Sequence, residues 1–115
     1  MAMNERMVNG VTVIELSGKF LNDPQVSDFV DRLSDLKESG AYKVVADLGG
    51  VNYISSPGVG ALVGGAKSLR EDSGDLKLAN LSERTENVLV LISRLGSVFH
   101  IFDTVDEAVN SFIWD

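Results

Sequence analysis

Short apolar runs alternate along the chain with longer stretches in which apolar residues recur every three or four positions. The runs are typical of strands, and the longer stretches are typical of helices with one apolar face. Strands are expected at residues 5–8, 11–17, 43–48, 76–81 and 98–102. Helix-start signals precede the four longer stretches and lie at Asn22-Asp23-Pro24, Ser56-Pro57, Ser82 and Asp103. This alternation predicts an α/β fold, in which residues 1–115 form a single layered domain with a mixed sheet of about five strands and four helices.

The ends of these elements carry signals of their own. Asn9-Gly10 separates the first two strands and predicts a hairpin, because both residues tolerate a positive φ. A glycine follows the apolar face of each of the first three helices and predicts where that helix ends (Gly40, Gly74 and Gly96). The inward faces of the last two helices are expected to consist of Val88, Leu91, Ile92 and Leu95, and of Val105, Ala108, Val109 and Phe112.

The junction between the third strand and the second helix, Val51–Leu62, has the most unusual composition. Serine is a preferred N-cap residue and proline is favoured at the first helical position, so Ser56 is predicted to cap the helix ahead of Pro57. Its hydroxyl is then expected to face out of the strand–helix turn. No charged residue lies between Leu48 and Ala66, which predicts an uncharged surface around this hydroxyl.

Charge and composition narrow the class of partner. The formal net charge is -7, which argues against nucleic acid or an anionic membrane as the main partner. The sequence has no cysteine, as is usual in a reducing cytoplasm, and its first residues do not form a signal peptide. The uncharged run contains six glycines and a proline, so no membrane-spanning helix is expected there. We therefore expect a cytoplasmic protein.

Candidate catalytic groups are few. His100 is the one histidine of the sequence and falls in a predicted strand, where a structural role is usual. Asp47 ends the predicted central strand, but no second charged residue follows until Lys67, so no acid–base pair is expected. No cluster of residues has metal-ligand spacing. The sequence predicts a protein that is not an enzyme and needs no metal or cofactor.

The second helix contains four glycines, at positions 58, 60, 64 and 65. They could permit close approach to the sheet or close approach of a partner, and the sequence does not separate these explanations. A glycine-rich run after a strand also occurs in nucleotide-binding loops. Here the third glycine comes one residue too late for that motif, so a nucleotide-binding domain is kept as the weakest alternative.

Several segments together resemble one known family. Ser55–Gly60 reads Ser-Ser-Pro-Gly-Val-Gly, where that family usually has Asp-Ser-[Ser/Ala]-Gly-Leu-Gly. The other matching segments are Val11–Gly18, Lys43–Leu48, Val51–Ile54, Leu76–Leu81 and Phe102–Ala108. Over nearly its full length the chain resembles the STAS domain of the bacterial anti-sigma factor antagonist family.

The resemblance implies a phosphorylation switch. In that family the serine aligned with Ser56 is phosphorylated by an anti-sigma factor that is itself a serine kinase, and a protein phosphatase reverses the reaction. The unphosphorylated antagonist sequesters the kinase and frees the sigma factor. Ser56 is then the expected phosphoacceptor, and the expected partner-binding residues are Tyr53, Ser55, Ser56, Gly58 and Val59.

This sequence departs from the family pattern on either side of that serine. Ser55 replaces the usual aspartate, and Pro57 follows the phosphoacceptor. Some members of the family are not phosphorylated and act as scaffolds. A non-phosphorylated STAS scaffold in a larger signalling assembly is therefore the second interpretation.

Overall fold

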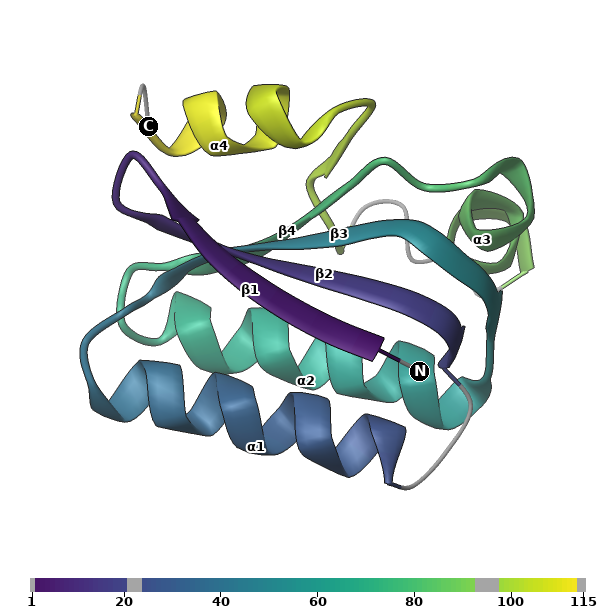
Figure 1. The fold of residues 1–115 in the computed structure, drawn as a ribbon, viewed down its shortest axis with the longest axis horizontal. Coiled ribbons are helices and arrows are strands. Elements are labelled where there is room, and N and C mark those ends of the chain that lie inside the picture. Colours follow the sequence, from purple (N-terminus) through teal and green to yellow (C-terminus); the bar gives the residue numbers. More distant parts are fainter. Residues whose placement is uncertain (1, 21–23, 93–97, 114–115) are drawn as a thin grey trace.

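The computed structural model describes residues 2–20, 24–92 and 98–113, which form a layered α/β structure around one five-stranded sheet (Figure 1). The strand order is β1-β2-β3-β4-β5; β1 runs antiparallel to β2, and the other neighbours are parallel. The strands are β1 (Ala2–Val8), β2 (Val11–Phe20), β3 (Lys43–Ile54), β4 (Asp75–Ala79) and β5 (Ile101–Phe102). The helices are α1 (Gln25–Glu38), α2 (Ser56–Arg70), α3 (Glu83–Asn87) with one π-helical turn η1 (Val88–Ile92), and α4 (Val105–Ile113).

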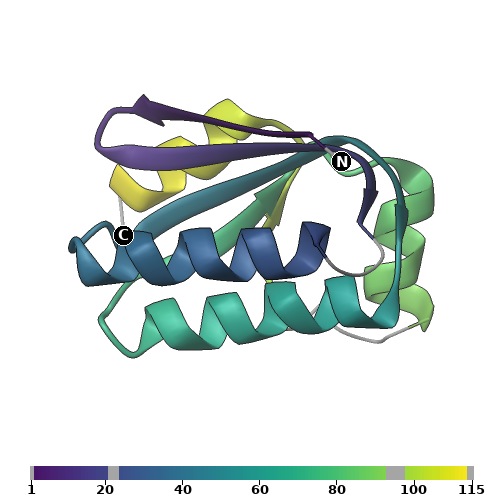
Figure 2. The ribbon, with the colours of Figure 1, turned by 60° about the horizontal axis from the view of Figure 1, so that its bottom comes forward.

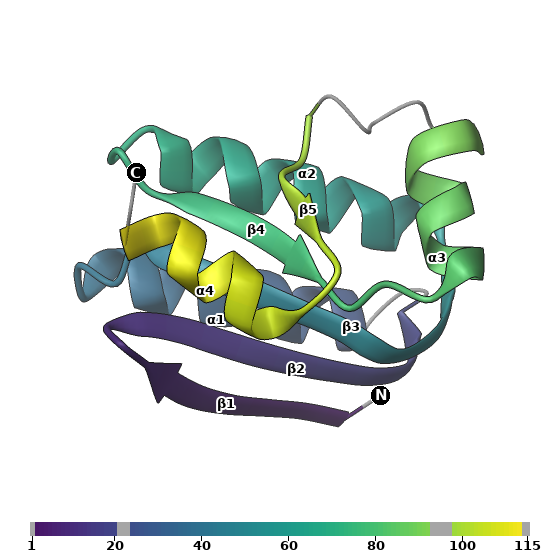
Figure 3. The same cartoon turned by 90° about the horizontal axis from the view of Figure 1, so that it is seen from above.

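The helices cover the two faces of the sheet unequally. α1 and α2 lie side by side on one face (Figure 2), and α4 crosses the other (Figure 3). The larger core lies beneath α1 and α2, and fully buried Phe29, Leu62 and Leu76 contribute to it from α1, α2 and β4. The smaller core beneath α4 contains Val11, Val13, Val45, Ala79, Ala108, Val109 and Phe112.

The N-terminal hairpin confirms the Asn9-Gly10 signal. Both residues have positive φ, 51° and 81°, as a tight two-residue turn between twisted strands requires. Both strands are longer than the apolar pattern indicated. Pairing with β2 extends β1 back to Ala2, and pairing with β3 extends β2 forward to Phe20. Backbone hydrogen bonding therefore extends each strand beyond its apolar run.

β3 is also longer than predicted. The sequence indicated a strand ending at Leu48, but the chain continues through Gly49 and Gly50 and pairs with the end of β2 as far as Ile54. A Cβ added at Gly50 would lie 2.8 Å from the Ser17 Cβ, and one added at Gly49 would lie 2.2 Å from the Asn80 amide nitrogen. The two glycines therefore permit close packing within a continuous strand, and they do not end it.

The third helix differs from the prediction. Ser82 caps it as expected, accepting a hydrogen bond from the Thr85 amide at 3.2 Å. A π turn has more residues than an α turn, so η1 changes the phase of the apolar positions. Leu89, which the predicted apolar face did not include, is fully buried. Of that predicted face, Val88 is partly buried, the structure does not describe the side chains of Leu91 and Ile92, and Leu95 and the predicted helix end at Gly96 lie outside the described residues.

Four further boundaries need correction. The fourth strand was expected at residues 76–81, but β4 runs from Asp75 to Ala79. The prediction that α2 ends at Gly74 was also wrong, because the helix ends at Arg70 and Ser73, not Gly74, has the positive φ. The last strand was expected at residues 98–102, but only Ile101 and Phe102 pair with β4. α4 is capped by Thr104, whose hydroxyl accepts from the Glu107 amide at 3.1 Å, and the prediction of Asp103 as the cap was wrong. The inward face of α4 is confirmed. Pro24 precedes α1 without a side-chain cap, and the predicted start signals Asn22 and Asp23 lie outside the described residues.

Candidate partner-docking site at the start of α2

The turn from β3 into α2 is a single residue, Ser55, and it caps the helix. Its backbone is extended, with φ -103° and ψ 173°, and its hydroxyl accepts a hydrogen bond from the Gly58 amide at 3.2 Å. The prediction that Ser56 is the N-cap was therefore wrong by one residue. Pro57 is accommodated at the second helical position because the amides of the first helical turn have no intrahelical acceptor to lose.

Ser56 is the first residue of α2, and its side chain is exposed. Because Ser55 supplies the cap, the Ser56 hydroxyl is not used for it. Among the residues that the structure describes, no group forms a hydrogen bond with this hydroxyl. The prediction that it faces out of the strand–helix turn is confirmed, although for a different reason from the one expected.

The five predicted partner-binding residues separate into two groups. The Tyr53 side chain is 52% exposed, Ser56 is exposed and Ser55 is half-buried. Gly58 and Val59 are buried, and Val59 is only 7% exposed. The helical period turns positions 58, 59 and 62 toward the sheet and positions 56, 60 and 64 outward. In this conformation Val59 cannot offer its side chain to a partner.

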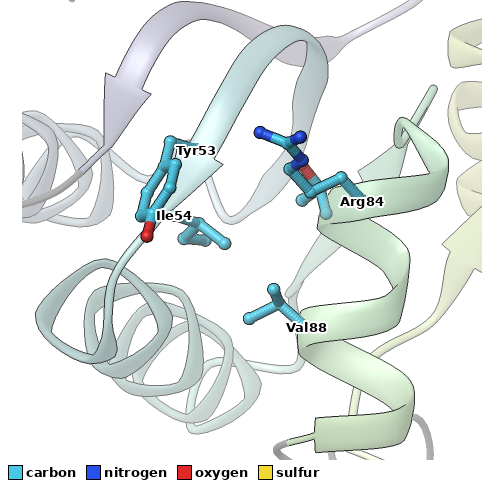
Figure 4. A pocket seen from close by; sticks show the side chains of 5 residues that line it. Tyr53, Ile54, Arg84 and Val88 are labelled. Atoms are coloured by element: carbon cyan, nitrogen blue, oxygen red, sulfur yellow. The ribbon is translucent and has the colours of Figure 1, made fainter.

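A charged residue lies beside the end of β3, the strand that leads into Ser55 and Ser56. A hollow of about 270 Å³ lies between the end of β3 and α3, and it is lined by Tyr53, Ile54, Arg84, Thr85 and Val88 (Figure 4). The sequence analysis missed Arg84, because it considered charges only along the chain from Leu48 to Ala66. The Ser82 cap signal placed Arg84 in the first turn of a helix, but only the tertiary fold brings that helix beside Tyr53.

A hydrogen bond holds α3 against the strand. The Thr85 side chain is buried, and its hydroxyl donates to the Val51 carbonyl at 3.4 Å. The Ser82 hydroxyl lies 3.0 Å from the same Thr85 hydroxyl and also caps the helix. These bonds connect the start of α3 to β3 and so fix the position from which Arg84 extends.

The four helical glycines have different roles. A Cβ at Gly65 would lie 2.5 Å from Leu33 Cδ1, so this glycine permits close packing of α2 on α1. A Cβ at Gly60 or Gly64 would meet nothing within 4 Å. All four lie within the helix α2, and no glycine-rich loop precedes it; the run therefore does not form the loop that the nucleotide-binding alternative requires.

The other candidate groups of the sequence form structural contacts. His100 Nδ1 lies 3.1 Å from Asp75 Oδ2, and Arg70 Nε donates to the other oxygen of the same carboxylate at 2.9 Å. Asp47 accepts from the Gly49 amide at 3.0 Å and from the Asn80 side-chain amide at 3.3 Å. Across residues 2–20, 24–92 and 98–113, acidic and histidine side chains do not gather in threes where they could hold a metal ion.

None of the helices described combines the length and the apolar character needed to cross a bilayer.

Comparisons with known proteins identify the family of the chain. Residues 2–108 match the STAS domain family. The chain is 30% identical over 105 residues to BtrV of Bordetella bronchiseptica, a candidate anti-sigma factor antagonist, covering 91% of this chain and 89% of that protein. It is 35% identical over 81 residues to the anti-sigma-B factor antagonist of Bacillus subtilis, covering 70% of this chain and 67% of that protein.

A solved structure agrees with this assignment. The Bacillus cell fate determinant SpoIIAA, solved in its phosphorylated form, superposes with a TM-score of 0.76 at 25% identity, covering 96% of this chain and 99% of SpoIIAA. The five-stranded mixed sheet with four helices is common to the two folds. The chain belongs to the STAS domain family, and its relatives there are named as anti-sigma factor antagonists.

Proposed function

We propose that this protein is an anti-sigma factor antagonist that works as a phosphorylation-controlled binding module in the cytoplasm. Unphosphorylated, it binds an anti-sigma factor that is a serine kinase, and so frees the sigma factor. Phosphorylation of Ser56 by that kinase releases the complex, and a protein phosphatase restores the binding form. The observation that carries the proposal is the exposed Ser56 side chain at the first position of α2. Its hydroxyl does not cap the helix, because the Ser55 hydroxyl does.

A phosphate at Ser56 is compatible with the fold. Phosphorylation adds about -1.5 to -2 charges at neutral pH. At the first turn of α2 the helix dipole and unpaired amides favour an anion by roughly 0.3–1 kcal/mol. The first turn contains no acidic residue that would oppose the phosphate. The domain therefore stays folded, and the modification acts on binding.

Phosphorylation weakens binding of the partner by more than it stabilises the start of α2. Packing a partner over an unpaired dianion removes the phosphate from water, which costs several kcal/mol even after relaxation. Since about 1.4 kcal/mol changes an equilibrium constant tenfold, the affinity falls by roughly a hundredfold or more. The interface penalty exceeds the small gain at the helix terminus, so phosphorylation favours release.

The exchange of the family's aspartate for Ser55 is consistent with this mechanism. Serine and aspartate are about equally good N-cap residues, so the helix start is kept. The exchange removes one negative charge beside the phosphoacceptor. The same exchange motivated the scaffold alternative, in which Ser56 is never phosphorylated.

Phosphorylation assays distinguish the switch from the scaffold. The purified protein is incubated with a kinase-type anti-sigma factor and ATP, and phosphate is located by mass spectrometry. We expect one phosphate, on Ser56, and none in Ser56→Ala. Ser34→Ala, which removes an exposed serine from α1, serves as the matched control and is phosphorylated normally. Phosphate on another residue, or none in the wild type, would refute the switch.

A further inference from the structure

The hollow beside Ser56 combines an apolar floor with a charged rim. Buried Ile54 and the partly buried Val88 line its base, the exposed Tyr53 ring forms one wall, and the Arg84 side chain extends over it from α3 (Figure 4). Tyrosine and arginine are the residue types that, with tryptophan, most often dominate the energy of protein interfaces. Two of its lining residues, Tyr53 and Ile54, precede Ser56 by three and two residues in the chain.

The charge of Arg84 is not neutralised within the described part of the molecule. Arg32, Lys37 and Arg70 each contact a carboxylate. Arg84 has no such contact among the described residues, although the sequence has 17 acidic residues against 10 basic ones. Arg84 also lines the two adjacent hollows, one formed with Gly49–Asn52 and the other with Glu83 and Asn87. Arg84 therefore lines three hollows near the junction, and the one acidic residue that lines any of them is Glu83.

We infer that the hollow is the docking site for a segment of the anti-sigma factor that carries an apolar side chain next to an aspartate or glutamate. The apolar side chain packs onto Ile54 and Val88 beside the Tyr53 ring. The carboxylate binds Arg84, whose planar fork matches a carboxylate in a two-bond geometry. This inference rests on the proposed function, and it states which feature of the partner is recognised.

Charge complementarity favours this occupant. A protein of net charge -7 repels an acidic segment over most of its surface, so such a segment gains from binding where a cation stands unpaired. The apolar floor is unsuited to a free phosphate or a nucleotide phosphate chain, which needs polar donors on all sides.

The inferred contact also explains how the switch reaches the partner. A phosphate on Ser56 stands close along the chain to the hollow that receives the carboxylate. Like charges brought together at an interface cost several kcal/mol. A phosphate on Ser56 would thus repel the acidic segment of the partner, whereas Arg84 attracts it.

Calorimetry on charge-reversal variants tests the inference, with a purified kinase-type anti-sigma factor that binds the wild-type protein as the probe. Arg84→Glu is expected to weaken binding by about 30-fold or more, as for truncation of a hydrogen-bonded interfacial charge pair. Arg6→Glu makes the same charge change on β1, near the hairpin and away from Ser56, and should alter the dissociation constant by less than about twofold through long-range charge alone. Arg84→Lys should lose less than Arg84→Glu, because the positive charge remains. Val88→Phe, which fills the hollow without adding charge, should also weaken binding.

A photocrosslinking amino acid at position 53 identifies the occupant directly. The expected crosslinked peptide comes from the anti-sigma factor and contains an apolar residue adjacent to Asp or Glu. A peptide without an acidic residue, or a crosslink to a second copy of this chain, would overturn the inference. Equal losses in Arg84→Glu and Arg6→Glu, or wild-type affinity in Arg84→Glu, would also overturn it.

Failure of this inference is distinguishable from failure of the proposed function. If phosphorylation of Ser56 weakens binding but Arg84→Glu does not, the switch stands and the docking site is wrong. If Arg84→Glu weakens binding but phosphorylation does not, the docking site stands and the switch is wrong. If no kinase-type anti-sigma factor binds the wild type, both are wrong.

Discussion

The Ser55 hydroxyl accepts a hydrogen bond from the Gly58 amide at 3.2 Å, and this bond determines what the next residue is free to do. A cap at Ser55 makes Ser56 the first helical residue, with an exposed side chain that the helix start does not use. Two adjacent serines therefore have separate tasks. One stabilises α2, and the other is available for modification.

Substitution of the two serines should separate these tasks. Loss of an N-cap costs about 0.5–2 kcal/mol, so Ser55→Ala should lower the free energy of unfolding by about 1 kcal/mol, whereas Ser55→Asp should largely preserve it. Ser56→Ala should change it by less than about 0.5 kcal/mol, as is usual for an exposed position. Urea denaturation of the three variants measures these changes in the free energy of unfolding. Equal destabilisation by Ser55→Ala and Ser56→Ala would contradict the assignment of the cap.

The glycines of α2 offer a matched pair of substitutions. Gly64→Ala adds a methyl group to open space and should raise stability by up to about 1 kcal/mol, because alanine is the better helix former. Gly65→Ala gains the same propensity but pushes into the buried side chains of Leu33 and Leu76, an overpacking that costs about 1–3 kcal/mol. Thermal unfolding should therefore give Gly64→Ala the higher midpoint. The reverse order would show that the α1–α2 packing is described wrongly.

The ion pair between β1 and α1 should make stability depend on pH. Arg32 donates to both carboxylate oxygens of Glu5, at 2.6 and 2.7 Å, and these hydrogen bonds lower the pKa of Glu5 below its usual 4.5. A carboxylate with a lowered pKa contributes fully above the unfolded-state pKa, and the contribution is lost as the pH falls through the folded-state value. Because the pair is partly exposed, its worth at pH 7 is about 0.5–1 kcal/mol.

Glu5→Gln should therefore destabilise the protein at pH 7 and lose that effect in acid. The difference in unfolding free energy from the wild type should be complete above about pH 5 and should shrink as the pH is lowered below 4.5. Glu38→Gln, at an exposed position with no ion pair among the described residues, is the control and should show little difference at either pH. A Glu5→Gln effect that persists unchanged at pH 3 would rule out the charge as its origin.

Much of the fold follows from local signals that the structure confirms. Asn9-Gly10 specifies the hairpin, Gly40 ends α1 at φ 85°, and Ser82 caps α3. Misplaced boundaries arise where pairing or packing overrides the local pattern. β3 continues to Ile54 because the end of β2 lies beside it, and the π turn makes Leu89 an inward residue. Such effects depend on neighbours that are distant in the sequence.

The residues of the candidate site could likewise be predicted from the sequence only in part. The sequence indicates a serine at the start of α2, because the Ser-Pro dipeptide is a local signal, yet two adjacent serines leave the capping residue ambiguous. It does not indicate Arg84, which is 28 residues from Ser56 and reaches the hollow only through the packing of α3 on β3. Residues Leu48 to Ala66 carry no charge, but the fold brings Arg84 beside Tyr53 from a distant part of the sequence.

Control of partner binding through Ser56 is measured most directly by the dissociation constant of the protein phosphorylated there. The phosphorylated and unphosphorylated forms are titrated against the same purified kinase-type anti-sigma factor, with Ser34→Asp as a control for added charge on an exposed helix position. We predict that phosphorylation raises the dissociation constant by roughly a hundredfold or more, and that Ser34→Asp changes it by less than about threefold. Equal affinity of the phosphorylated and unphosphorylated forms would contradict the switch.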